Sequence, residues 1–401
     1  MLDLLKGIRV VSFNHFLLGP MGVQALGDLG ADVISVEGAD GAWQRHWAGG
    51  NIFPDGQSAL HLCANRNKRS VAIDLKSAKG REIALRLVDS ADVVAENFRP
   101  GVMEKLGLGY EALKAHKPGL IYASASGYGP DGPYVEKPGQ DLLAQALFGM
   151  MAITGQAVTG PRPAGASVID HHGAALFAMG ILAAIVRRQR TGQGCRVEAS
   201  LMQSALDLQA EPLVAWINAP VRPPVTQAFR HVAGWYYAAP YGVYATKDGH
   251  LALSLSSLKA LGEAIGEPRL AAFTEEDSWT RQDEITELIA QRLETAPTSE
   301  WAARMEPLKI WYAPVQGYAQ IVDDPQVKHM KSLVTVPGTG DTGAPLTLVN
   351  HPVLYDGEAA EVRLAPQQLG AQTEEVLTEI GLSASEIAAL ARANVVKLRD
   401  G

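Results

Sequence analysis

The sequence has few cysteines, and its opening residues do not resemble a signal peptide. It contains two cysteines among 401 residues, Cys63 and Cys195. Two cysteines cannot build a disulfide framework, so they favour a reducing compartment. The opening residues include Asp3, Lys6 and Arg9, and they lack the cationic start and unbroken apolar core of a signal peptide. We therefore expect a soluble cytoplasmic protein that does not associate with a membrane.

The chain also lacks a net positive charge. Its formal net charge of −8 argues against nucleic acid as a partner. One segment differs, because residues 66–105 hold nine basic and six acidic residues. A small polyanion would need such a patch. The alternative is an ordinary solvated helix face, which fits residues 79–86 better than the crowded NRNKRS at 65–70.

A glycine-rich dinucleotide-binding turn is missing too. Short β-rich runs alternate with helical spacing in the first third of the chain, which predicts βαβ units and a parallel sheet. The expected strands are IRVVSF, DVISVE, SVAIDL, DVVAEN and LIYASAS, and the expected helices are MGVQALGDLG, AKGREIALRLVDSA and YEALKAH. An NAD-binding domain would look similar, with Glu37 ending its second strand. However, the first turn reads NHFLLGP rather than G-x-G-x-x-G, which argues against that class.

The length and the 47% hydrophobic content allow a large core and two domains. A helical stretch at 201–219 is followed by PVRPPVTQ, which has the prolines of a linker. We expect a large α/β domain from residues 1–220 and 335–401 and a small α+β domain from 225–334. The small domain should begin in earnest near Phe229. Its expected elements are strands in WYYAAPYGVYAT and GHLALSLS and helices at 258–265 and 283–293, and terminal helices are expected at 369–380 and 384–391.

One carboxylate stands directly before a long apolar run. Asp170 precedes residues 172–186, in which only the first residue is polar. The run has the length of a core helix and is too short to span a bilayer. Asp170 should therefore lie near a helix N-terminus, where unpaired N–H groups and the macrodipole favour an ionised carboxylate. A plain N-cap is the alternative that the local pattern favours.

The order and spacing of several motifs resemble the class III CoA-transferases, a group that includes formyl-CoA and carnitine CoA-transferases and is related to alpha-methylacyl-CoA racemase. The resemblance covers nearly the whole chain. It is carried by GIRVVSFNHFLLGP, LGADVISVE, NRNKRSVAIDLK, ADVVAENFRPGVMEKLGLGYEALK, SGYGPDGPY, PGQDLLAQA, SVID, GILAAIVRRQRTGQG and LGAQTEEVLTEIGLSASEIAAL. It implies a Rossmann-like large domain, and two subunits that interlock as a homodimer.

The resemblance also implies a reaction. Coenzyme A moves from an acyl-CoA to an acceptor carboxylic acid, with acyl-CoA and small carboxylic acids as the partners and no permanently bound cofactor. Asp170 would be the nucleophile that forms an acyl-aspartyl anhydride and then an aspartyl-CoA thioester. Backbone N–H groups at the helix N-terminus would stabilise the charges that develop. The expected CoA contacts are His15, Arg66, Lys76, Asn97, Phe98, Lys105 and Leu106.

The residue type at position 140 distinguishes a CoA-transferase from a racemase. The racemase reads AGHD where this chain reads PGQD, and its His acts with the later Asp as a two-base pair. Gln140 cannot titrate, but it can donate a hydrogen bond to a thioester or anhydride oxygen, so transfer is favoured. Racemisation and a catalytically silent CoA-binding module are the alternatives. Asp141 beside it is either a hydrogen-bonding carboxylate or the cap of the next helix.

Several positions depart from the family pattern. Leu17 replaces a polar residue, and Gly38 stands where a phosphate-binding arginine is common, so Arg45 or Arg69 would have to substitute. SLSSLKAL lacks the glycine-rich flap of formyl-CoA transferase, which puts a lid in doubt. His171 and His172 are adjacent, point to different faces and have no third ligand at a suitable spacing, so no metal site is expected.

Overall fold

The chain divides into two compact units. A computed structural model describes residues 2–225 and 231–399. The large unit comprises residues 1–144, 167–208 and 325–401, and the small unit comprises 145–166 and 209–324. The predicted boundaries differ, because residues 145–166 and 209–220 belong to the small unit and the chain returns to the large unit at 325 rather than 335. The predicted start near Phe229 lies outside the described residues.

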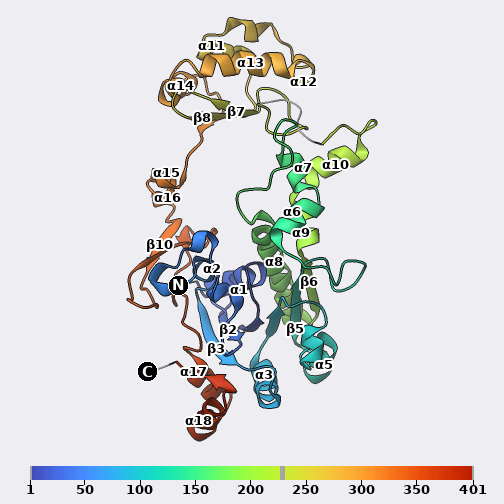
Figure 1. The fold of residues 1–401 in the computed structure, drawn as a ribbon, viewed down its shortest axis with the longest axis vertical. Coiled ribbons are helices and arrows are strands. Elements are labelled where there is room, and N and C mark those ends of the chain that lie inside the picture. The colour runs from blue at the N-terminus through green and yellow to red at the C-terminus, as the bar shows by residue number, and fades with distance from the viewer. Residues whose placement is uncertain (1, 226–230, 400–401) are drawn as a thin grey trace. The chain divides into compact units, whose positions relative to one another are not determined.

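A seven-stranded sheet forms the centre of the large unit (Figure 1). Its order is β14-β3-β2-β1-β4-β5-β6, and every neighbouring pair is parallel except β14 with β3. The strands are β1 (Arg9–Phe13), β2 (Asp32–Glu37), β3 (Lys68–Ile73), β4 (Val93–Glu96), β5 (Ile121–Ser126), β6 (Arg196–Ser200) and β14 (Val396–Lys397). The mixed α/β fold with a parallel sheet is thus confirmed. The edge strands β6 and β14 were not anticipated, and β14 contains only two residues.

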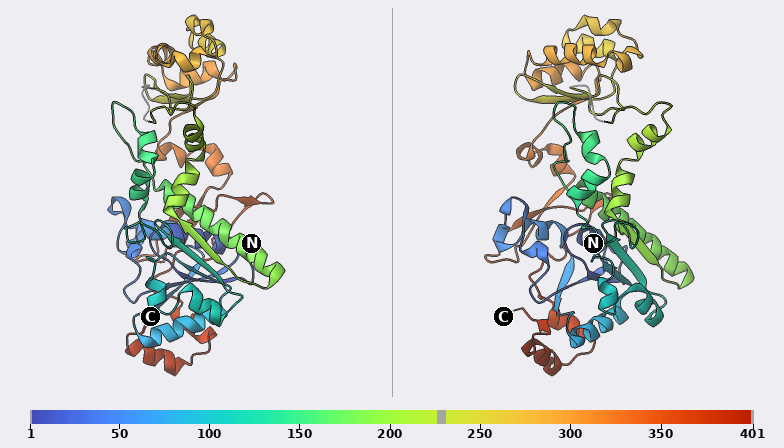
Figure 2. Two further views of the ribbon diagram at one scale, coloured as in Figure 1. Left: turned by 90° about the vertical axis from the view of Figure 1, so that its right-hand side faces the viewer. Right: turned by 45° about the vertical axis from the view of Figure 1, so that its right-hand side comes forward.

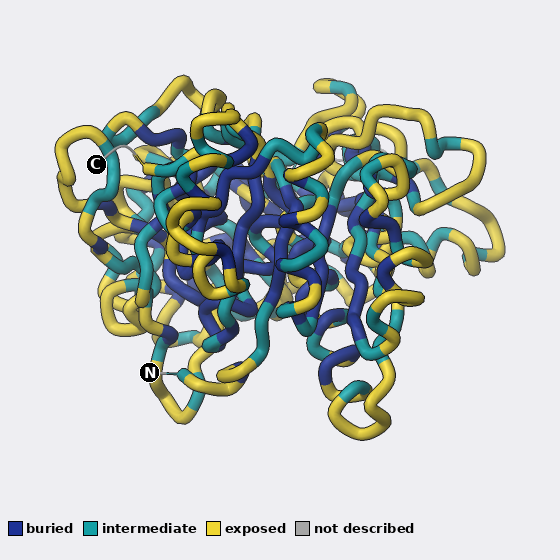
Figure 3. The backbone as a smooth tube through the Cα atoms, turned by 90° about the horizontal axis from the view of Figure 1, so that it is seen from below, coloured by how far each residue is buried: buried dark blue, intermediate teal, exposed yellow. Residues whose placement is uncertain are grey.

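Alternating side chains of these strands bury two faces. On one face, Val11, Ile34 and Val94 form one hydrophobic cluster with Leu87 and Val376 from flanking helices. The dark strands at the centre of Figure 3 show how deeply this sheet is buried. The helices that contribute to this cluster are α3 (Ala78–Ser90), α4 (Val102–Lys105), α5 (Tyr110–His116), α17 (Thr373–Glu379) and α18 (Ala384–Arg392). The sequence predicted α3, α5, α17 and α18 within a few residues.

Two other helices, α1 (Leu18–Asp28) and α8 (Val168–Thr191), pack against each other and against the sheet. Close approach requires small residues at their contact. A Cβ on Gly22 would lie 2.9 Å from the Phe177 ring, and one on Gly173 would lie 2.6 Å from Leu18 Cδ1. These glycines therefore bring the N-terminal turn of α8 against the start of α1.

Helix α8 is longer than predicted. It contains 24 residues because Arg187 and Arg188 continue it to Thr191, and it ends where Gly192 adopts φ 71°. By length and composition alone it could cross a membrane. Its contacts with α1, α9 (Leu201–Leu208), β5 and β6 identify it instead as a core helix of the large unit (Figure 2).

The small unit has its own core, in which Trp301, Tyr244 and Leu261 are fully buried. Its antiparallel sheet contains β7 (Gly242–Ala245), β8 (His250–Leu253) and β9 (Tyr312–Pro314). Its helices are α7 (Met150–Thr154), α10 (Ala210–Asn218), α11 (Leu258–Ile265), α12 (Asp277–Thr280), α13 (Gln282–Leu293), α14 (Thr298–Met305) and α15 (Tyr318–Ile321).

The large unit also contains α2 (Ala59–Ala64), α16 (Pro325–His329) and the hairpins β10–β11 (Leu333–Val336, Leu346–Val349) and β12–β13 (Leu354–Tyr355, Glu358–Ala359). Helix α6 (Asp141–Leu147) bridges the two units in sequence.

Candidate active site

Asp170 is the third residue of α8, as the sequence predicted. Ser167, at the ordinary N-cap position, makes no side-chain capping hydrogen bond. The cap comes instead from Asp141, the first residue of α6. Asp141 Oδ2 accepts hydrogen bonds from the backbone N–H groups of Ile169 and Asp170, each at 2.9 Å. The N-terminal turn of α8 is therefore held by a carboxylate that lies 28 residues earlier in the sequence.

The electrostatic expectation for Asp170 was wrong. We expected the helix N-terminus to favour its ionised form, which would lower its pKa. Burial and, second, the negative charge of Asp141 instead raise the pKa of Asp170 to about 7, and a backbone hydrogen bond from Leu18 opposes this rise only in part. The N–H groups of Ile169 and Asp170 are occupied by Asp141, so the nearest backbone donor to the Asp170 carboxylate belongs to the start of α1.

Gln140 immediately precedes α6, where its carbonyl oxygen accepts the N–H of Ala144 at 2.9 Å. Gln140 is exposed. Because Asp141 holds the first turn of α8, the backbone of Gln140 lies beside the same turn. A hydrogen bond from its side chain to a substrate oxygen stays a prediction.

Most of the predicted CoA contacts gather at one end of the sheet. His15 follows β1, Lys76 follows β3, and Asn97 and Phe98 follow β4. Lys105 ends α4 and Leu106 comes directly after it. Because parallel strands place their carboxyl ends together, these side chains share the edge at which ligands of open α/β sheets bind.

His15 and Asn97 join the loops after β1 and β4. The Asn97 side chain accepts the N–H of His15 at 2.7 Å and donates to the His15 carbonyl oxygen at 2.8 Å. The His15 ring lies 3.1 Å from the Asn97 carbonyl oxygen and contacts the Phe98 ring edge-on at 5.2 Å. Burial lowers the pKa of His15, so the neutral ring is favoured. The two loops thus form one rigid surface.

The structure argues against the predicted contact between Arg66 and CoA. It precedes β3 and lies at the amino end of the sheet, opposite the cluster around His15. Its guanidinium is buried and bonds both oxygens of Asp28 at 3.0 and 2.7 Å, and it also donates to the Val349 carbonyl oxygen. A phosphate would have to displace these partners, so the position of Arg66 supports a structural role and not CoA binding.

The other cations of the NRNKRS segment are engaged as well. Lys68 is buried, and its ammonium donates to two backbone carbonyls and to Asn65. Arg69 pairs with Asp32 and Glu379 at the amino end of the sheet. Lys68 therefore stabilises the interior of the large unit, whereas Arg69 belongs to a partly exposed ion-pair network with partners distant in sequence.

Arg45 does lie beyond the carboxyl end of β2, but it is also paired. Its Nε and Nη2 donate to the two oxygens of the buried Glu37 carboxylate, each at 2.6 Å. Burial opposes ionisation of Glu37, yet the hydrogen bonds and charge of Arg45 hold its pKa below the ordinary value. The suggestion that Arg45 or Arg69 replaces the arginine missing at Gly38 gains no support from this arrangement.

Sequence reasoning missed an exposed row of rings that begins at His15. Ring centroids lie 4.7 Å apart between His15 and Phe16, 4.8 Å between Phe16 and Trp43, and 5.0 Å between Trp43 and Trp47. Phe16, Trp43 and Trp47 are 38%, 44% and 48% exposed. The Trp-x₃-Trp spacing was the one available signal. The row offers an apolar surface next to the His15–Asn97 loops.

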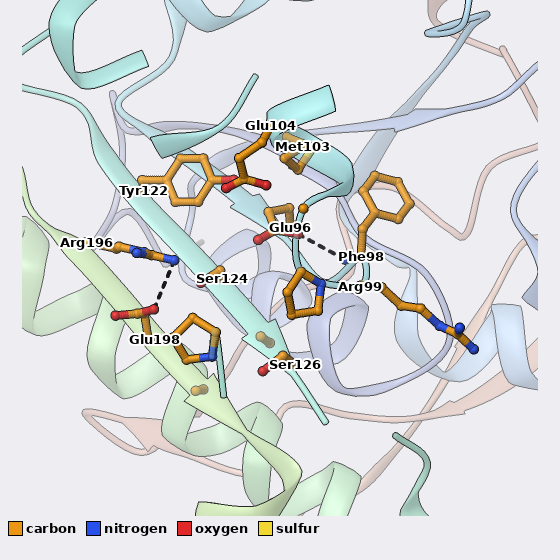
Figure 4. A pocket seen from close by; sticks show the side chains of 15 residues that line it. Glu96, Phe98, Arg99, Met103, Glu104, Tyr122, Ser124, Ser126, Arg196 and Glu198 are labelled. Atoms are coloured by element: carbon orange, nitrogen blue, oxygen red, sulfur yellow. Dashed lines mark hydrogen bonds and ion pairs between the residues drawn. The ribbon is translucent and has the colours of Figure 1, made fainter. Parts of the chain in front are cut away.

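A second missed feature is a pocket along β5 and β6 and the turn after β4, with a volume of about 70 Å³ (Figure 4). Glu96, Tyr122 and Glu104 line this pocket, and Arg196 pairs with Glu198 along one side. Glu96 accepts the N–H of Phe98 at 2.9 Å. Burial, with Glu104 as a smaller contribution, raises the pKa of Glu96 to about 8. Glu96 therefore carries a proton at neutral pH while it braces the turn of Asn97 and Phe98.

His171 and His172 do not converge. The His171 ring lies 2.8 Å from the Ser167 carbonyl oxygen, and the His172 ring lies 2.7 Å from Asp207 on α9. Within residues 2–225 and 231–399, no three His, Cys, Asp or Glu side chains are placed to hold a metal ion.

The family model described as CoA-transferase family III matches residues 5–373. The chain is 36% identical to the succinyl-CoA:mesaconate CoA-transferase of Haloarcula marismortui, over 87% of this chain and 89% of that protein. It is 32% identical to the acetyl-CoA:oxalate CoA-transferase of Acetobacter aceti, over 86% of this chain and 89% of that protein. A crystal structure of a CaiB/BaiF family protein from Brucella suis matches with a TM-score of 0.81 at 28% identity, over 93% of this chain and 98% of that one.

The fold is that of an α/β enzyme class that works on CoA thioesters. The chain belongs to CoA-transferase family III. It is a CoA-transferase, and CoA thioesters are its substrates.

Proposed function

We propose that the protein transfers coenzyme A from an acyl-CoA to a free carboxylic acid, with Asp170 as the nucleophile. The observation that carries the proposal is the half-buried Asp170 carboxylate in the first turn of α8, which accepts a hydrogen bond from Leu18 at the start of α1. A carboxylate suits this exchange because the anhydride and thioester that it forms are comparable in energy with the substrates.

The first half-reaction has two steps. The ionised Asp170 oxygen attacks the thioester carbonyl carbon, the C–S bond breaks, and the CoA sulfur leaves as a thiolate with the electron pair. An acyl-aspartyl anhydride remains. The thiolate then attacks the aspartyl carbonyl carbon, the donor acid leaves as its carboxylate, and an aspartyl-CoA thioester remains. The acceptor carboxylate reverses both steps and regenerates Asp170. Charge balances throughout, and no proton enters or leaves.

The surroundings of Asp170 support this chemistry. Burial strengthens electrostatic interactions and limits hydrolysis of the anhydride. The Leu18 N–H is proposed to stabilise the Asp170 carboxylate before attack and the aspartyl carbonyl oxygen afterwards. Exposed Gln140 is proposed as a further donor to the substrate oxygen. The His15, Asn97 and Phe98 surface with Lys76, Lys105 and Leu106 is proposed to hold the CoA nucleotide.

Substrate class is proposed from the relatives. Mesaconate and oxalate, which appear in the names of two relatives, are small dicarboxylates. We therefore propose that small carboxylic acids, dicarboxylates among them, serve as acceptors. Screening acyl-CoA donors against such acids by mass spectrometry would identify the pair.

The test of Asp170 uses the substitution Asp170→Asn. Incubating the native protein with an acyl-CoA and then with hydroxylamine should convert Asp170 to a hydroxamate that is found on its peptide. The variant should give no hydroxamate and should not transfer CoA between acids. Asp207→Asn is a matched control, because Asp207 on the adjacent helix pairs with His172 and should leave labelling intact. A label on another peptide, or exchange by Asp170→Asn, would contradict the assignment.

A further inference from the structure

We infer that Asp141 is the positioning residue of the nucleophile: it fixes the first turn of α8 and directs a negative charge at Asp170. The inference rests on the proposed function of Asp170. It goes beyond that proposal because it assigns a second carboxylate to the reaction without placing it in contact with substrate.

The Asp141 carboxylate is buried against the start of α8. Asp141 is 5% exposed, and one of its oxygens accepts two successive N–H groups, those of Ile169 and Asp170, at 2.9 Å. The residue that normally caps a helix, Ser167, makes no such bond. Losing Asp141 would therefore leave two donors of the α8 N-terminus without this acceptor, and the backbone that carries Asp170 would lose its fixed position.

The same contacts change what the helix start does for catalysis. A helix N-terminus with free N–H groups stabilises a nearby carboxylate, and a stabilised carboxylate is a poorer nucleophile. Asp141 takes up those groups and adds a like charge. Asp170 loses its own charge when it becomes an anhydride or a thioester, so the repulsion between the two carboxylates is relieved at that step. Asp141 thereby favours the acylated states over the free enzyme.

Other titratable groups near this turn are engaged elsewhere. His172 of α8 and Asp207 of α9 pair with each other, and the His171 ring contacts the Ser167 carbonyl oxygen. Asp28, at the far end of α1, pairs with Arg66. Among the described residues, Asp141 is the charged group whose field acts on Asp170.

Two substitutions separate charge from capping. Asp141→Asn keeps an oxygen that can accept both N–H groups but removes the charge, whereas Asp141→Ala removes both. Titration of Asp170 is followed by ¹³C NMR of aspartate-labelled full-length protein, with the Asp170 signal assigned by its loss in Asp170→Asn. Amide hydrogen exchange reports the turn at Ile169 and Asp170.

In Asp141→Asn we expect the Asp170 midpoint to fall by about one pH unit, since removal of a like charge favours ionisation, while amide exchange stays slow. The aspartyl-CoA adduct formed with an acyl-CoA should fall roughly tenfold relative to native protein, matching one pH unit of charge stabilisation. In Asp141→Ala, exchange at both amides should also accelerate. An unchanged Asp170 midpoint in Asp141→Asn would overturn the charge role, and unchanged exchange in Asp141→Ala would overturn the capping role.

The outcomes separate this inference from the proposed function. If native protein forms no adduct on Asp170 yet the midpoint falls in Asp141→Asn, the proposed function fails and the positioning relation stands. If native protein forms the adduct and its yield is the same in Asp141→Asn, the proposed function stands and the contribution of Asp141 to it is overturned.

Discussion

Arg66 and Asp28 form a two-point ion pair inside the large unit, with exposed side-chain fractions of 4% and 2%. Asn67 and His351 also contact the Asp28 carboxylate, at 2.8 and 3.2 Å. Burial opposes ionisation of Asp28, but hydrogen bonds from His351 and Arg66 hold its pKa below the ordinary value. The pair connects α1, the start of β3 and the segment after β11.

Removing one member of this pair should destabilise the fold. Arg66→Ala leaves the Asp28 charge buried without its main partner, which typically costs about 3–5 kcal/mol. Urea denaturation should show this loss, and folded Arg66→Ala protein should bind CoA as tightly as native protein. Lys79→Ala is the control, because Lys79 is exposed and pairs with exposed Glu82; it should change stability little. Weaker CoA binding at native stability would restore the original assignment of Arg66.

Lys76 should contribute to CoA binding. It is exposed and lies three residues after the end of β3, at the carboxyl end of the sheet. Lys76→Ala should weaken CoA binding by roughly three- to fivefold at low salt. The difference should shrink at 1 M salt, where the screening length is about 3 Å. Calorimetric titration at two salt concentrations measures this, again with Lys79→Ala as the control. Equal dissociation constants for native protein and Lys76→Ala at low salt would place the phosphates elsewhere.

Glu96 should make stability depend on pH. Its folded pKa of about 8 exceeds the ordinary value of 4.5, so the folded state binds more protons than the unfolded state between these values. The free energy of unfolding therefore falls as pH rises through this window. Glu96→Gln should flatten that decline and be more stable than native protein above pH 8. Asp170→Asn, tested alongside, should remove the smaller decline that ends near pH 7. A native pH profile in Glu96→Gln would show that Glu96 is ionised in the folded protein.

Gln140 predicts the fate of the alpha hydrogen. A two-base racemase exchanges this hydrogen with solvent, because each base returns a proton drawn from water. With Gln140 in place of a base, incubation of a 2-methylacyl-CoA in heavy water should give no deuterium at the alpha carbon at a rate comparable to turnover. Adding a suitable carboxylic acid should instead yield its CoA thioester. Deuterium uptake without any acceptor acid would favour racemisation, with His171 or His172 as the base.

Assembly as an interlocked homodimer is a separate prediction. It follows from the family resemblance, and α8 leaves Met179 and Val186 exposed at 61% and 45%, which suits a covered surface. Threaded chains cannot separate without unfolding. Tagged and untagged dimers mixed under native conditions should therefore form no hybrid dimers within hours. After the mixture is unfolded and refolded, hybrid dimers should form. Hybrids within minutes, or a monomer by light scattering, would contradict the prediction.

The sequence predicted the local features of this protein better than its charges. Strands such as residues 32–37 and the helix after Asp170 follow from alternation and from apolar runs, which depend on neighbouring residues. The position of His15 and Asn97 at one edge follows from parallel topology. The role of Arg66 could not be predicted, because its partner Asp28 lies on another element and nothing in the local pattern distinguishes a buried arginine from an exposed one.

The same limit applies to Asp170. Its place at a helix start was readable, but the direction of its pKa was not. That direction depends on burial and on Asp141, which approaches from a different helix. The sequence pattern around Asp170 indicates only the electrostatic effect of its own helix. The pKa of Asp170 depends on every charged or apolar group that the fold brings near it.

The two-residue strand β14 has a consequence for the order in which the protein can fold. Val396 and Lys397 pair with Ile73 and Ala72 and so cover the outer edge of β3. During translation, β3 is synthesised more than 300 residues before β14. During synthesis the nascent chain therefore presents a bare parallel edge, a template for pairing with other chains. We therefore expect that deletion of residues 396–397 increases aggregation during refolding.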